Sequence, residues 1–157
     1  SPTWALPSEL LLALRGEPNP GKCGETTCTR VVTIPFQVPV AGGGLEDRAV
    51  TMDLVIRREN GGVREIAVRG PELFSRLFEA SRGQPLDPDK ERARAEAVTY
   101  ALEVVSGAFE GTAPATRCDR NITPPEILRR ECDGWTIRVV IGDTPADDDV
   151  VSVRGPR

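Results

Sequence analysis

The chain has 157 residues, of which 39% are hydrophobic and 28% charged, which is typical of one globular domain rather than of a disordered or fibrous chain. Its formal net charge of −4 argues against a nucleic-acid surface, because an acidic protein gains nothing from neutralising phosphates. No stretch approaches the roughly 20 apolar residues of a membrane span, so we expect no transmembrane segment.

Residues 1–22 are predicted to form a short helix and a lead-in to the rest of the domain. The segment LPSELLLALR, residues 6–15, predicts a helix with a leucine-rich face, which Gly16 ends. The lead-in after it is rich in proline and glycine. Because the chain begins at Ser1 and not at a methionine, we interpret it as a trimmed or mature form, which is compatible with a removed signal peptide.

Three predicted strands follow, each with apolar residues at every second position. The first is TRVVTIPFQVPV, residues 29–40, and the Gly-rich segment 41–48 is predicted as a flexible loop. The second is AVTMDLVIRREN, residues 49–60. Its last residue, Asn60, and two glycines form a hairpin turn signal, so the third strand is predicted to return over 63–70.

Two prolines, Pro35 and Pro39, both lie at odd-numbered positions of the first predicted strand, so their backbone groups face the same side. Proline has no N–H to donate and is confined to strand edges, strand starts or bulges. We therefore predict that residues 31–40 form an edge strand, blunted against pairing with another chain.

The apolar period then changes to that of helices. PELFSRLFEASRG, residues 71–83, predicts a helix with Pro71 at its first position. A longer helix is predicted to start with Asp87 as its N-cap and to stop at Gly111, with a stripe of alanine and valine facing the core.

A third helix is predicted over TPPEILRREC, residues 123–132, from a capping-box pattern at its start. WTIRVVIG, residues 135–142, predicts a strand, and VVSVRG, residues 150–155, predicts an edge strand. Residues 1–157 therefore predict a single α+β domain stapled by disulfides. We expect one antiparallel or mixed sheet of about five strands, with about two to four helices covering one face.

Four cysteines carry the clearest chemical signal: Cys23, Cys28, Cys118 and Cys132. Their C-x4-C and C-x13-C spacings match neither zinc knuckles nor a C-x-x-C redox motif, and the chain has no histidine. These features favour two disulfides over free thiols or a metal site, with Cys23–Cys28 and Cys118–Cys132 as the favoured local pairing. The other two pairings of four cysteines remain open.

Disulfides are typical of an oxidising compartment, so we expect an extracytoplasmic protein of the periplasm, the cell surface or the medium. The basic residues are almost all arginine, and only Lys22 and Lys90 are lysines. We interpret this bias as that of a GC-rich bacterial genome.

The sequence offers little catalytic chemistry. With no histidine and no nucleophile or phosphate-loop motif, we expect neither an enzyme nor a cofactor. Paired carboxylates are the remaining route, as in glycoside hydrolysis. The candidates are Asp53 and Glu65 on neighbouring strands, and the acidic loop that holds Asp143, Asp147, Asp148 and Asp149. That loop lacks the calcium-binding D-x-D-x-D-G pattern, which favours a solvated loop and leaves a calcium site as an open alternative.

These observations favour a non-catalytic secreted or periplasmic domain that binds a protein or a component of the cell envelope. An inhibitor or immunity protein directed at a secreted enzyme is the alternative, because a stapled loop over residues 23–28 is the kind of rigid element that an inhibitor presents. A carboxylate-dependent hydrolase is a second alternative.

Overall fold

The computed structural model describes residues 22–60, 62–108, 118–132 and 134–155 of the chain. The helix predicted at 6–15 and the helix stop at Gly111 lie outside these residues. Over the described residues, neither helix has the length and apolar character needed to cross a membrane.

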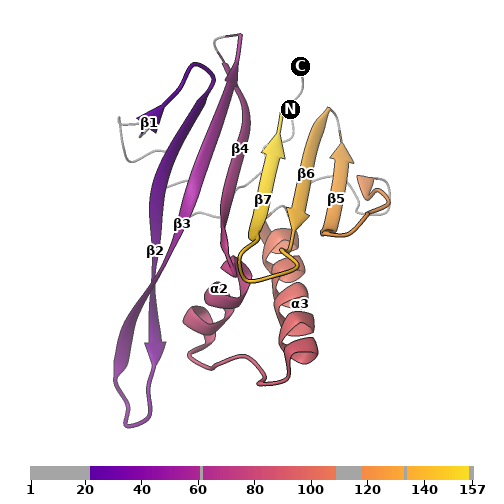
Figure 1. The fold of residues 1–157 in the computed structure, drawn as a ribbon. Coiled ribbons are helices and arrows are strands. Elements are labelled where there is room, and N and C mark those ends of the chain that lie inside the picture. Colours follow the sequence, from indigo (N-terminus) through magenta and orange to yellow (C-terminus); the bar gives the residue numbers. More distant parts are fainter. Residues whose placement is uncertain (1–21, 61, 109–117, 133, 156–157) are drawn as a thin grey trace.

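Seven antiparallel strands form one sheet in the order β1-β2-β3-β4-β7-β6-β5 (Figure 1). The strands are β1 (Lys22–Cys23), β2 (Thr27–Pro39), β3 (Leu45–Glu59), β4 (Gly62–Pro71), β5 (Glu126–Cys132), β6 (Trp135–Val140) and β7 (Asp148–Arg154). The described residues also hold two helices, α2 (Leu73–Arg82) and α3 (Lys90–Ala108), which pack against the sheet. The structure is therefore mostly sheet, and the predicted fold with about five strands and two to four helices is wrong.

The segment predicted as a third helix, residues 123–132, is the edge strand β5. The carbonyl oxygen of Thr123, the first residue of the capping-box pattern, accepts a hydrogen bond from the N–H of Glu126 (3.0 Å) and closes a turn around the two prolines. β5 then pairs with β6, from Glu126 opposite Val140 to Cys132 opposite Trp135. Pairing along a whole neighbouring strand outweighs a local helix signal, because strand preference depends mainly on cross-strand context.

The last strand, β7, lies in the middle of the sheet and not at its edge. It pairs with β6 on one side and with β4 on the other, where Val151 is opposite both Val139 and Val68. β4 and β7 are far apart in the sequence, so this pairing joins the two halves of the sheet. The prediction of an edge strand at 150–155 is therefore wrong.

Both helices begin at other residues than predicted. Pro71 ends β4, and Glu72 precedes α2 with a left-handed backbone (φ 48°). At the start of α3, Oδ1 of Asp89 accepts hydrogen bonds from the N–H groups of Glu91 (3.0 Å) and Arg92 (3.1 Å). Asp89, and not the predicted Asp87, therefore acts as the cap of α3.

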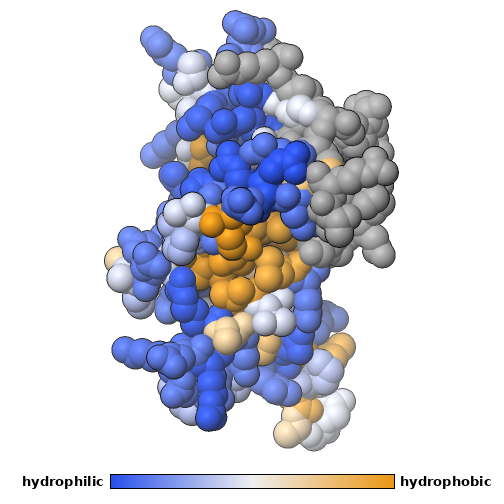
Figure 2. All heavy atoms as spheres, turned by 90° about the vertical axis from the view of Figure 1, so that its right-hand side faces the viewer, coloured by the Kyte–Doolittle hydropathy of each residue, from blue (hydrophilic) through white to orange (hydrophobic). Residues whose placement is uncertain are grey.

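The core has two parts that meet at α2. One part lies between α2 and strands β2 to β4, and the other between α3 and strands β6 and β7. The predicted small-residue stripe of α3 is buried at Ala97, Ala101 and Val105. Figure 2 shows that apolar side chains also reach the surface on the β5 side of the molecule, where Ile127 and Leu128 are only partly buried.

Strand β2 lies at the other edge of the sheet, as predicted. Within the described chain, its residues 31–39 pair only with β3, because β1 pairs with no more than Cys28 and Thr29. Pro35 and Pro39 both belong to this exposed stretch. The edge therefore carries two positions that cannot donate a backbone hydrogen bond to an added strand.

Replacing both Pro35 and Pro39 by valine should promote dimers or aggregates, because two N–H donors return to an open edge. Light scattering measures this directly. The matched control replaces Thr33 and Gln37 by valine: both are exposed residues of the same strand, and the change adds apolar side chains but no N–H donor. If the two double variants associate equally, the prolines do not protect the edge.

Candidate functional site

Cys23 and Cys28 form a disulfide across the β1–β2 hairpin, where the two residues are directly opposite. Inside this ring the N–H of Gly24 donates a hydrogen bond to the carbonyl oxygen of Thr27 (2.8 Å). Cys118 is buried and also disulfide-bonded. Its predicted pairing with Cys132 stays a prediction, because the side chain of Cys132 lies outside the described part of the structure.

The carboxylates predicted as a catalytic pair, Asp53 and Glu65, are not brought together. Asp53 of β3 is opposite Arg69, whereas Glu65 is opposite Arg57, four residues further along the strand. Four residues of a strand span about 13 Å. Glycosidase carboxylates lie roughly 5–9.5 Å apart, so this pair does not have their arrangement. Glu65 is instead held by Arg154 through two contacts of 3.0 Å.

The segment predicted as an acidic loop, residues 143–149, runs into the first residues of β7 and directs its carboxylates to different partners. Asp143 pairs with Arg94 (3.6 Å), and Asp148 pairs with Arg69 (3.9 Å). Asp147 accepts hydrogen bonds from the N–H and the hydroxyl group of Thr144. Among the described residues, no group of three or more Asp, Glu, Cys or His side chains is arranged to hold a metal ion.

The fourth carboxylate of this loop, that of Asp149, is buried and only 4% exposed. Its Oδ2 accepts a hydrogen bond from the N–H of Phe74 at the start of α2 (3.0 Å), and its Oδ1 accepts one from the N–H of Gly142 (2.9 Å). Glu72, at the cap position of α2, makes no side-chain cap bond. Asp149 thus caps the helix from a strand 75 residues away, at the end where a negative charge is favourable.

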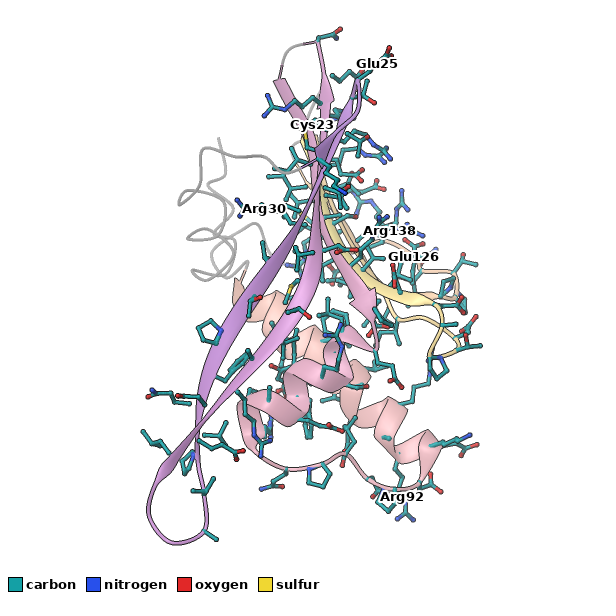
Figure 3. All side chains as sticks on the ribbon, turned by 60° about the vertical axis from the view of Figure 1, so that its left-hand side comes forward. Cys23, Glu25, Arg30, Arg92, Glu126 and Arg138 are labelled. Carbon is teal, nitrogen blue, oxygen red and sulfur yellow. A yellow bond between two sulfur atoms is a disulfide. The ribbon has the colours of Figure 1, made fainter. Side chains whose placement is uncertain are left out.

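A network of charged side chains covers β5 and β6 on the face of the sheet opposite α3. Glu126 accepts hydrogen bonds from Arg138 (2.7 Å) and Arg129 (3.3 Å), and Figure 3 shows Glu126 beside Arg138. Arg129 also donates to Glu131 (2.8 Å), and Glu131 pairs with Arg120 (3.7 Å). The network alternates positive and negative groups from Arg138 of β6 across β5 to Arg120, which precedes β5 in the chain.

The pKa of Glu126 is lowered by its surroundings. Burial by itself raises the pKa of this carboxyl group, whose side chain is 10% exposed. Hydrogen bonds and charge attraction from Arg138, and then from Arg129, together outweigh the effect of burial. Glu126 is therefore held ionised, which is the opposite of what a general acid requires.

A two-stranded arm extends from the body of the sheet (Figure 1). In this arm, residues 45–52 of β3 pair with residues 32–39 of β2, and β4 joins β3 only from Asp53 onward. Its inner half rests on α2: Arg76 donates to the carbonyl oxygen of Thr51 (2.7 Å), and Arg48 donates to that of Glu79 (3.3 Å). The arm is thus supported by two hydrogen bonds between an arginine side chain and a backbone carbonyl group, both near the middle of α2.

The end of α2 fits the arm closely. Gly83 caps the helix with a left-handed backbone (φ 69°), which favours glycine. A Cβ at this position would collide with the side chain of Val38, which is buried. Glycine is therefore required at residue 83 by both its backbone conformation and the contact with the arm.

The tip of the arm, residues 40–45, is exposed and partly apolar. Leu45 is 65% exposed and Val40 38% exposed. The hydrogen bond from the N–H of Val40 to the carbonyl oxygen of Gly44 (3.0 Å) closes the turn. Two large apolar side chains thus stand at the end of a supported hairpin, where they contribute nothing to the core.

Sequence reasoning missed both the arm and the Glu126 network. The arm could have been recognised from the length of its two alternating segments, because β2 and β3 have 13 and 15 residues but β4 has only 10. The Glu126 network had no such signal. Residues 123–132 were predicted as a helix, and on a helix Glu126, Arg129 and Glu131 would not share the surface that they share in the strand. Comparisons of the chain with protein-family models, with curated proteins and with solved structures found no match.

Replacing Asp149 by alanine should destabilise the protein by about 3 kcal/mol, because it leaves two N–H groups without their charged acceptor in a buried site. The free energy of unfolding in urea measures the loss. Replacing Asp148 by alanine is the control, since it removes the neighbouring carboxylate from an exposed pair and should cost less than about 1 kcal/mol. Equal unfolding midpoints for the two variants would contradict the role given to Asp149.

Replacing Glu126 by glutamine should destabilise the protein by about 2 kcal/mol at pH 7, because two charge-assisted hydrogen bonds are weakened. A lowered folded-state pKa gives stability that is fully present above the unfolded-state pKa, about 4.3 for glutamate. This stability is lost as the pH falls through the folded-state pKa. Urea unfolding of both proteins between pH 7 and 3 should therefore show the gap closing at the acidic end. A gap that stays constant over this range would contradict the prediction.

Proposed function

We propose that this chain is a non-catalytic binding or accessory domain, and that the tip of the β2–β3 arm is its contact with a protein or an envelope component. The observation that carries the proposal is the exposure of Val40 and Leu45 at the end of a hairpin that α2 supports. Burying these two side chains against a partner would contribute roughly 2 kcal/mol each. Support by α2 holds the arm before it binds, which reduces the entropy lost on association.

An oxidising location fits this proposal. The Cys23–Cys28 disulfide joins β1 to the edge strand β2, and such bonds persist in the periplasm, at the cell surface or in the medium. We therefore propose an extracytoplasmic domain.

The charged groups support binding over catalysis. Glu65 and Glu126 are both held by arginines, and the pKa of Glu126 is lowered. A carboxyl group that donates a proton in catalysis needs a raised pKa. The hydrolase alternative would need Asp53 and Glu65 close together, but their positions along the two strands put them too far apart for that chemistry.

The disulfide-closed loop of residues 24–27 favours a second candidate, an inhibitor of a secreted enzyme. Its backbone is fixed by the bond from Gly24 to Thr27 and by a hydrogen bond from the N–H of Arg58 to the carbonyl oxygen of Thr26 (2.7 Å). Glu25 is exposed in this loop, at the end of the molecule opposite the arm tip (Figure 3). Because the two candidates use opposite ends, variants in one region separate them.

The test is a pull-down from the native cell envelope with the oxidised protein and with a tip variant, Val40→Ser with Leu45→Ser. We expect the unmodified protein to retain a defined partner and the tip variant to lose it, because the apolar contact is removed. The matched control is Val31→Ser, which removes an apolar side chain with the same 65% exposure as Leu45 but outside the tip.

The control variant should retain the partner like the unmodified protein. Retention of the same partner by the tip variant contradicts the arm as the contact. If Glu25→Ala alone abolishes retention, the contact lies in the disulfide-closed loop, and the inhibitor candidate replaces the first.

A further inference from the structure

The two helices lie side by side (Figure 1) and form an open groove of about 370 Å³. Phe78 and Arg82 line it from α2, and Glu96, Thr99, Tyr100 and Glu103 line it from α3. None of these side chains belongs to the arm or to the Glu126 network. Glu96 and Glu103 lie seven residues apart, about two helical turns, so both carboxylates stand on the same side of α3.

The floor of this groove is an aromatic platform. The rings of Phe78 and Tyr100 meet edge to face, with centroids 5.6 Å apart and an interplanar angle of 89°. The hydroxyl group of Tyr100 lies 3.3 Å from that of Ser81 on α2. These contacts join the two helices.

The protein's own Arg82 occupies this platform. Its guanidinium carbon lies 5.0 Å from the centroid of the Phe78 ring, and its Nη2 lies 3.8 Å from Oε2 of Glu103. Both charged side chains are more than half exposed. An exposed ion pair of this kind is weak, so Arg82 is held loosely in a site whose chemistry suits a guanidinium group.

We propose that the groove between α2 and α3 is a binding site for an arginine side chain of a protein partner, and that Arg82 is an internal occupant which this arginine displaces. An aromatic face beside a carboxylate recognises a planar guanidinium group by stacking and by charge together. Glu96 adds a second carboxylate to the rim of the groove, so an incoming cation is attracted even while Arg82 is in place. The site uses none of the side chains at the tip of the arm, so this proposal does not rest on the function proposed for the tip.

The test uses the peptide acetyl-Gly-Arg-Gly-amide as the probe, with the matched citrulline peptide as its neutral isostere. Tyr100 is the chain's only tyrosine, so its ring proton resonances report on the groove in an NMR titration. Removing the internal competitor by Arg82→Ala should tighten binding of the arginine peptide by about threefold, because the open groove becomes the dominant state. Adding Glu103→Gln to that variant should weaken binding by about tenfold, and so should changing the peptide to citrulline.

The control variant is Arg58→Ala, which removes an exposed arginine from β3, outside the two helices that form the groove. It should bind the arginine peptide like the unmodified protein. Arg82→Gln keeps the length of the side chain without its charge and should behave like Arg82→Ala, so the result does not depend on how one variant folds. Equal affinity of Arg82→Ala and the unmodified protein, or equal binding of the arginine and citrulline peptides, overturns the proposal.

Discussion

The carboxylate of Asp149 joins the start of α2 to the turn between β6 and β7, although Phe74 and Asp149 are 75 residues apart in the chain. Burying a charge is costly unless hydrogen bonds replace its hydration. Here two backbone N–H groups do so, and one of them, that of Phe74, lies at the positive end of a helix. Gly142 allows the turn to close, since a Cβ at this residue would collide with the carbonyl oxygen of Asp147.

The position of α2 that results determines how the rest of the molecule packs. Phe74 belongs to the part of the core under α3, whereas Leu73 and Ala80 belong to the part under β2 to β4. Leu77 contacts both parts. The helix therefore bridges the two halves of the sheet above the β4–β7 junction. Because packed interiors transmit strain, a shift of α2 would be felt in both halves.

The two proposed contact regions both depend on the last turn of α2. Gly83 packs against Val38 of the arm, and the preceding residue, Arg82, lies in the groove beside α3. By contrast, the arginines on the face of the sheet opposite α3 are paired with carboxylates of the sheet, as Arg138 is with Glu126. The surface charges thus differ in how firmly they are held, and Arg82, whose ion pair with Glu103 is exposed, is the arginine that we propose a partner's cation displaces.

The sequence by itself determined the elements whose signals are local. Alternating apolar residues gave the strands over 29–40, 49–60 and 63–70, and an alanine and valine stripe gave the long helix, whose Ala97 is buried. The five-residue separation of Cys23 and Cys28 likewise predicted a disulfide that the structure contains. In each case the pattern repeats within a few residues, and the partners that satisfy it are neighbours in the chain.

Only the tertiary structure decided what depends on distant partners. Residues 126–132 became a strand because β6 was available to pair with them, against their own helix signal. β7 is central because it pairs with the edge of β4 that β3 does not occupy, and with β6 on its other side. The register between β3 and β4 likewise separates the candidate carboxylates, because Glu65 is opposite Arg57 and therefore four residues along the strand from Asp53. Asp149 is brought to the start of α2 by contacts that the sequence does not show. Register and burial arise from contacts between segments far apart in the chain, and no local pattern of residues encodes them.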